Sequence, residues 1–138
     1  MKKYFFLLIV LSLAGQGFAQ GVSANANGPV ITFEKKNHNF GDIYQGDKVE
    51  ETFKFTNTGN EPLIITNVQV TCGCTTPKGY PRDPIAPGGK GEITIAFNSA
   101  GKSGMQNKVV TVISNASNAD GAQISFTTNV LEKKVQAQ

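Results

Sequence analysis

Short β-prone runs separated by glycine, asparagine and proline make up the chain from about residue 30 onward. The alternation is clearest over residues 49–57, where Val49, Phe53 and Phe55 share one face and polar side chains occupy the other. Turn residues recur about every 8 to 12 residues, a spacing typical of sandwiches and barrels. No stretch has the period of an amphipathic helix. The pattern predicts a single all-β domain.

About seven strands are predicted, which favours an immunoglobulin-like β-sandwich, with a small barrel as the alternative. Four prolines within residues 77–87 lack the amide hydrogen that a sheet ladder needs, so this segment is expected to be a loop. Within residues 63–72, Ile64, Val68 and Val70 are expected to point inward. The predicted strands cover residues 30–34, 40–43, 49–57, 63–72, 92–98, 108–114 and 124–130.

The N-terminus is typical of a cleavable signal peptide. Lys2 and Lys3 precede an apolar run, and the small residues Gly17 and Ala19 indicate cleavage after Ala19. The run falls short of the roughly 20 residues that span a bilayer, so a retained anchor is the weaker alternative. No cysteine lies at the cleavage point. We therefore expect a periplasmic or secreted protein that is not a lipoprotein and has no membrane span after signal removal.

The predicted organisation has four parts. Residues 1–19 form the signal peptide, 20–29 a flexible leader of small and polar residues, 30–131 the β-sandwich domain and 132–138 a polar tail. The net charge is +3 for the whole chain and includes the two lysines of the signal peptide. The remaining lysines are interspersed with acids, so no nucleic-acid partner is expected.

Cys72, Gly73 and Cys74 form the one chemically distinctive motif and contain the only cysteines. In an extended strand the two thiols share a face, and Gly73 lets the backbone bend, so a disulfide can form. Closing so short a loop adds only roughly 1.6 kcal/mol of stability, and the bond would be comparatively easy to reduce. Two thiolates can instead hold Cu(I). Both cysteines can also be small buried apolar side chains without chemistry.

No other group of residues in the sequence indicates a catalytic site. His38, the only histidine, is expected to have a structural or exposed role. Alternation spreads the nearby Asp42 and Asp47 over solvated faces, whereas acid–base catalysis needs paired groups in different environments. Residues 88–91 are rich in glycine but follow a proline in a turn, which does not fit a phosphate-binding loop. The sequence predicts a protein that is not an enzyme and uses no cofactor.

Several motifs follow one another in a fixed order along most of the chain. They are HNFGDI (38–43), FKFTNTG (53–59), PL (62–63), CGCT (72–75), PIAPG (84–88), TV (111–112) and SNA (114–116). Together they resemble the bacterial family known as domain of unknown function 1573. The resemblance implies an immunoglobulin-like sandwich related to the domains of major sperm protein, abnormal spindle and hydin proteins, which are binding or scaffolding modules. The motifs mark structural positions at His38, Phe40, Gly41, Asn57, Gly59, Pro87 and Gly88.

The sequence leaves two hypotheses for the function. The first is a non-catalytic module that binds a protein or a cell-envelope component, either by strand addition at a sheet edge or through a loop that contains Tyr80 and Arg82. The alternative is a thiol–disulfide or Cu(I)-binding protein that uses Cys72 and Cys74.

Overall fold

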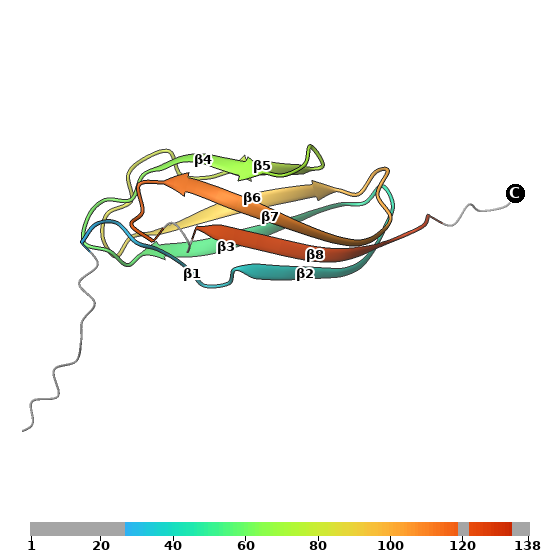
Figure 1. Ribbon diagram of the computed structural model, residues 1–138, viewed down its shortest axis with the longest axis horizontal. Helices are drawn as coiled ribbons and strands as arrows, with labels where there is room; N and C mark the ends of the chain where they lie inside the picture. Colours follow the sequence, from blue (N-terminus) through green and yellow to red (C-terminus); the bar gives the residue numbers. More distant parts are fainter. Residues whose placement is uncertain (1–26, 119–121, 134–138) are drawn as a thin grey trace, which may run out of the picture.

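Two four-stranded sheets pack face to face in the computed structural model, which describes residues 27–118 and 122–133 (Figure 1). One sheet has the order β1-β3-β6-β5 and the other has the order β2-β8-β7-β4. The strands are β1 (Ile31–Phe33), β2 (Asn37–Tyr44), β3 (Lys48–Asn57), β4 (Ile65–Val70), β5 (Thr75–Gly79), β6 (Lys90–Asn98), β7 (Gly104–Ser114) and β8 (Gln123–Leu131). The prediction of an all-β sandwich is confirmed. In this described part of the chain, no helix is long and apolar enough to cross a membrane.

The first two strands form one edge of each sheet. β1 pairs antiparallel with β3, and β2 then pairs in parallel with β8, from Asn37 opposite Ser125 to Tyr44 opposite Leu131. The other ladders are antiparallel. The chain therefore changes sheets at five connections, namely β1–β2, β2–β3, β3–β4, β4–β5 and β6–β7.

The core lies between the two sheets and is rich in phenylalanine. Phe97 of β6 and Phe126 of β8 come from opposite sheets, and their ring centroids are 5.3 Å apart. Phe53 and Phe55 of β3 are each 1% exposed, as the alternation in residues 49–57 predicts. Full burial of such a side chain contributes about 2 to 3 kcal/mol. The hydrophobic contact between the sheets thus holds the sandwich closed.

The strand before the cysteines differs from the prediction at its start. Ile64 was expected inside but is 40% exposed, whereas Leu63 and Ile65 are buried. The ladder between β4 and β7 shifts register between Ile65 and Asn67. This irregularity reverses the alternation, so that odd-numbered residues point inward before it and Val68 points inward after it.

The proline-rich segment is not entirely a loop, which corrects the sequence prediction and raises the number of strands to eight. Its start belongs to β5, where Pro77 lies opposite Ile95 and the register shifts before Gly79. β5 is an edge strand, so the missing amide hydrogen of Pro77 can face outward without breaking the ladder.

The contacts of the domain extend slightly before the predicted boundary at residue 30. Gly28 and Pro29, which were assigned to the flexible leader, are buried. Gly28 N–H donates to Asn60 Oδ1 at 2.7 Å, and Ser117 N–H donates to Pro29 O at 2.8 Å. These bonds explain why this end of the leader is fixed. The predicted signal peptide, the leader up to residue 26 and the tail from residue 134 lie outside the described residues.

Candidate functional site

Cys72 and Cys74 lie where the chain crosses from β4 in one sheet to β5 in the other. A disulfide joins them, with their Cα atoms 5.3 Å apart. The backbone turns tightly here, because Thr75 N–H donates to Cys72 O at 3.2 Å. Gly73 lies between the cysteines with open space around it. Of the three interpretations of the motif, the disulfide is the one that the structure contains.

Hydrogen-bond donors surround the two sulfur atoms. Cys74 N–H donates to Cys72 Sγ at 3.2 Å, and Thr75 Oγ1 lies 3.9 Å from each sulfur. Thr75 is only 3% exposed, while both cysteines are half-buried. Asn98 N–H donates to Cys74 O at 2.9 Å, which fixes the motif to β6. The disulfide is therefore accessible from solvent, whereas the donors around it are held in place.

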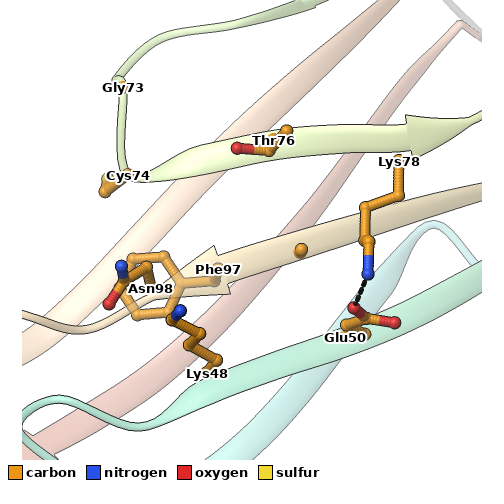
Figure 2. Close-up of a pocket in the computed structure, with 9 residues that line it drawn as sticks. Lys48, Glu50, Gly73, Cys74, Thr76, Lys78, Phe97 and Asn98 are labelled. Atoms are coloured by element: carbon orange, nitrogen blue, oxygen red, sulfur yellow. Dashed lines mark hydrogen bonds and ion pairs between the residues drawn. The ribbon is translucent and has the colours of Figure 1, made fainter.

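A groove of about 320 Å³ opens beside Cys74 (Figure 2). Phe97 contributes an apolar part of its lining, and Lys48 and Lys78 contribute positive charge. Lys78 forms an ion pair with Glu50, which Figure 2 shows further along the strands from Cys74. Lys48 forms no ion pair with any carboxylate in residues 27–118 and 122–133. The groove thus combines an accessible disulfide with one uncompensated cation.

Metal ligands do not cluster within the described ranges, where no three His, Cys, Asp or Glu side chains come together. A cysteine binds a metal as the thiolate. Cu(I) could therefore bind at Cys72 and Cys74 only after the disulfide is reduced.

Tyr80 and Arg82, the predicted partner-binding residues, stack on each other just after β5. The Arg82 Cζ atom lies 4.2 Å from the centroid of the Tyr80 ring. Tyr80 is half-buried and packs against the core, whereas Arg82 is exposed. Neither residue lines the groove beside Cys74. The structure thus places this loop next to the end of β5 but outside the groove.

His38 and Phe40 belong to a surface cluster on β2. His38 Nδ1 lies 2.9 Å from Lys35 Nζ, and His38 Nε2 lies 3.4 Å from Glu51 Oε2. An ammonium group can only donate, so Nδ1 accepts this bond and Nε2 faces the carboxylate. The His38 ring contacts Phe40 edge-on at 4.5 Å, and Phe40 contacts the buried Phe126 at 5.5 Å. The histidine thus joins a salt-bridge cluster to the core.

Gly41 forms the irregularity that bends β2. Its φ of 72° lies in the left-handed region that favours glycine, and the ladder with β8 shifts between Asn39 and Asp42. Gly41 N–H donates to Asn39 Oδ1 at 2.8 Å, and Thr128 Oγ1 donates to Gly41 O at 2.8 Å. The glycine of the HNFGDI motif therefore serves the backbone geometry of this edge.

Asn57 is a fully buried hub at the end of β3. Its Nδ2 donates to Glu61 O at 2.8 Å and to Ile85 O at 2.9 Å. Its Oδ1 accepts from Val30 N at 3.2 Å and from Gly59 N at 3.1 Å. One amide side chain thus satisfies backbone groups from three separate segments.

Pro87 and Gly88 form the turn that docks against this hub. Gly89 N–H donates to Ala86 O at 2.8 Å, and Gly88 has a φ of 78°. Gly88 N–H donates to Asn57 O at 2.7 Å, and Asn57 N–H donates to Gly89 O at 2.8 Å. Pro87 presets the bend and Gly88 supplies the left-handed residue that such a turn requires. The FKFTNTG and PIAPG motifs therefore meet in space.

A further surface, which the sequence analysis did not single out, covers the outside of the β2-β8-β7-β4 sheet. We call its outward-facing residues the β7 face. The exposed apolar side chains are Met105, Val109 and Ile113 along β7, which are 72%, 37% and 36% exposed, and Tyr44 on β2. Among the surrounding outward positions, Leu131 is apolar and Asp42 is charged. The others are uncharged and polar, namely Asn37, Asn39, Asn67, Gln69, Asn107, Thr111, Gln123, Ser125, Thr127 and Asn129.

The β7 face carries fewer charged side chains than the outer face of the other sheet. On the β7 face, Asp42 is the one charged strand residue, and Asn129 Nδ2 donates to its Oδ1 at 3.0 Å. The outer face of β1-β3-β6-β5 instead carries Lys48, Glu50, Lys54, Lys78, Lys90 and Glu92. The only sequence signal for this difference is the run VVTVI at 109–113, which apart from Thr111 is apolar in both alternating sets.

Comparison with solved structures shows the fold. A protein of unknown function from Porphyromonas gingivalis W83 superimposes with a TM-score of 0.63 at 19% identity, covering 80% of this chain and 51% of that one. The ASH/PapD-like domain of human CEP192 matches with a TM-score of 0.55 at 12% identity, over 75% of this chain and 87% of that one. The Vibrio cholerae protease VesB matches with a TM-score of 0.53 at 16% identity, over 75% and 32%.

This chain thus spans about half the length of the Porphyromonas protein and about a third of VesB. The shared feature is an immunoglobulin-like sandwich, as the sequence predicts. A comparison with curated proteins finds no match. The family model described as "Protein of unknown function (DUF1573)" matches residues 31–130, which include all eight strands except the final residue of β8. The chain therefore belongs to the DUF1573 family.

Proposed function

We propose that this chain is an exported, non-catalytic module that binds another protein through the β7 face. The observation that carries the proposal is the line of exposed apolar side chains along β7, on a face where Asp42 is the one charged residue within the eight strands. Contact regions of protein–protein interfaces are depleted in charged residues and enriched in Met and Tyr, both of which occur here as Met105 and Tyr44.

The surface chemistry favours a partner whose own contact region is apolar and uncharged. Burial of Met105, Val109 and Ile113 would remove apolar area from water. Lys36, which lines a hollow together with Val109, has a long side chain that can keep its charge in water. A neutral polysaccharide fits less well, because sugar rings stack on aromatic side chains and this face offers only Tyr44. The amides and hydroxyls around the apolar line would form the polar rim of a protein interface.

The sheet edges support face binding over strand addition. β1 has three residues, β2 is bent at Gly41, and β5 contains Pro77. On β4, Val68 N–H donates to Asn67 Oδ1 at 2.9 Å, which occupies a donor that an added strand would need. Short, bent, proline-bearing or capped edges are the means by which proteins prevent strand addition.

The proposal is tested by photo-crosslinking in intact cells with p-benzoylphenylalanine in place of Val109, compared with the same group in place of Thr94 on the charged sheet. We expect a discrete protein adduct from position 109 and none from position 94. The captured partner is then purified and titrated with the wild-type protein and with M105E and I113E. Each substitution buries a charge at the contact, so we expect the affinity to fall at least about tenfold.

Glu92→Gln on the opposite face is the matched control and should leave the affinity unchanged. Affinity should also stay nearly constant between about 50 mM and 500 mM salt, because screening acts only on charged groups. Equal adducts from both positions, adducts that contain only polysaccharide or only this chain, or a steep loss of affinity with salt would contradict the proposal.

Export is tested separately by the mass of the protein recovered from the periplasmic fraction or the medium. Cleavage after Ala19 gives a chain that begins at Gln20. Recovery of the full chain beginning at Met1 from membranes would contradict this part of the proposal.

A further inference from the structure

The geometry points to a thiol–disulfide exchange site at Cys72 and Cys74, whose co-reactant is a thiol that enters the adjacent groove. This inference is independent of the β7 face, because the groove lies between β3, β5 and β6, on the other sheet. It rests on the accessibility of the disulfide, the donors around Cys72 Sγ and the free cation of Lys48.

The two sulfur atoms have different surroundings, which sets the direction of attack. Cys74 lines the groove, whereas Cys72 does not. Cys72 Sγ accepts a hydrogen bond from Cys74 N–H at 3.2 Å. A disulfide reacts at the sulfur that a thiolate can reach, and it releases the sulfur whose thiolate is the more stable. Cys74 Sγ is therefore the sulfur attacked, and Cys72 Sγ is the leaving group.

The exchange transfers two electrons to the disulfide from two substrate thiols, which belong to one dithiol or to two molecules of a monothiol such as glutathione. A substrate thiolate attacks Cys74 Sγ, the bond between Cys74 and Cys72 breaks, and Cys72 leaves as a thiolate. The second substrate thiolate then attacks the substrate sulfur of the mixed disulfide and releases Cys74 as a thiolate. The two protons lost by the substrate thiols end on Cys72 and Cys74. The substrate leaves as a disulfide, and the protein holds a dithiol.

Lys48 and Thr75 assist this exchange as positioning groups. The reactive form of a thiol is its anion, and a nearby lysine stabilises that anion. Figure 2 shows Lys48 at the same end of the groove as Cys74, across β6 from it, whereas Lys78 forms an ion pair with Glu50. Thr75 Oγ1 lies 3.9 Å from both sulfurs and can turn its hydroxyl toward the Cys72 thiolate.

The fold allows the ring to open without unfolding. Cys74 O is bonded to Asn98 N–H, and Thr75 pairs with Phe97 in the ladder, so the backbone from the Cys74 carbonyl onward is held by β6 rather than by the disulfide. Only Gly73 separates the cysteines, so cleavage of the bond releases little chain entropy. Both features favour reversible cycling.

Glutathione and cysteamine, an anionic and a cationic thiol, are the probes for the test. The oxidised full chain is treated with each thiol, quenched with acid, alkylated and analysed by mass spectrometry, while circular dichroism follows the fold. We expect reversible reduction with the fold retained. Fragmentation between residues 72 and 74 should place the transient glutathione adduct on Cys74.

Lys48→Gln should slow the reaction with glutathione several-fold and slow the reaction with cysteamine less, because only the anionic probe loses an attractive charge. Lys54→Gln, on the same strand but outside the groove, is the matched control and should change neither rate. Reduction that requires prior unfolding, a glutathione adduct on Cys72, or equal rates for K48Q and K54Q would overturn the inference.

Discussion

The Nδ2 atom of Asn57 donates a hydrogen bond to the carbonyl oxygen of Ile85 at 2.9 Å. Asn57 is fully buried, with 0% of its surface exposed. The bond joins the end of β3 to the segment that leads into β6. Leu63 and Ile85 exchange two backbone bonds of 2.8 Å beside it, which makes this end of the sandwich a connected network.

Asn57→Ala should lower the free energy of unfolding by about 2 to 4 kcal/mol, because it leaves buried amide and carbonyl groups without partners. Urea unfolding followed by circular dichroism measures the change. Asn107→Ala, at an exposed position of β7, is the control and should stay within about 0.5 kcal/mol of the wild type. Equal stability of the two variants would refute the hub role of Asn57.

Gly59→Ala should be strongly destabilising. A Cβ at position 59 would overlap the backbone from Gly28 to Val30, which cannot move away as a flexible side chain could. We expect a loss of about 2 kcal/mol or more. Gly79→Ala meets no atom within 4 Å and should change stability by no more than about 1 kcal/mol. Thermal melting of the two variants measures the difference, and similar melting temperatures would contradict the close approach.

Ile64→Ser and Ile65→Ser test the irregularity in β4. Ile65 is 4% exposed, so its replacement by a polar residue should cost about 3 kcal/mol. Ile64 points outward at 40% exposure, and its replacement should cost less than about 1 kcal/mol. Denaturant unfolding of the two variants measures the free energy of unfolding of each. The reverse order of stabilities would restore the simple alternation that the sequence predicts.

Lys78→Ala should change the free energy of unfolding by less than about 1 kcal/mol, although it removes the ion pair with Glu50. Both side chains are about half exposed, at 53% and 48%, so solvent screens their attraction. The same urea titration at low and high salt measures the effect. A loss of several kcal/mol that disappears in salt would show a stronger pair than this exposure allows.

Local sequence patterns were sufficient to predict the strands that have one buried face and one solvent-exposed face. The alternation of Phe53 and Phe55 with polar residues places β3 correctly, because its inner face meets the other sheet and its outer face meets water. The motifs around Asn57 and Pro87 are likewise enough to indicate the family from the sequence alone. These features depend on neighbours in sequence or on a pattern repeated along the strand.

Other features depend on a partner strand that local sequence does not specify. Ile64 faces outward because of a register shift against β7, and Pro77 fits a strand because β5 has only one neighbour. The groove brings together Lys48, Cys74 and Phe97 from separate elements. The β7 face could not be predicted because residues 109–113 are apolar in both alternating sets apart from Thr111, so the pattern does not say which set is covered.

The parallel pairing of β2 with β8 has a mechanical consequence. β1 starts at one end of the long axis, whereas β8 ends at the other (Figure 1). A force that pulls Ile31 and Leu131 apart would load the β1·β3 and β2·β8 hydrogen bonds in shear, so that many must break together rather than one after another. We expect a domain with this strand arrangement to resist tension along its long axis.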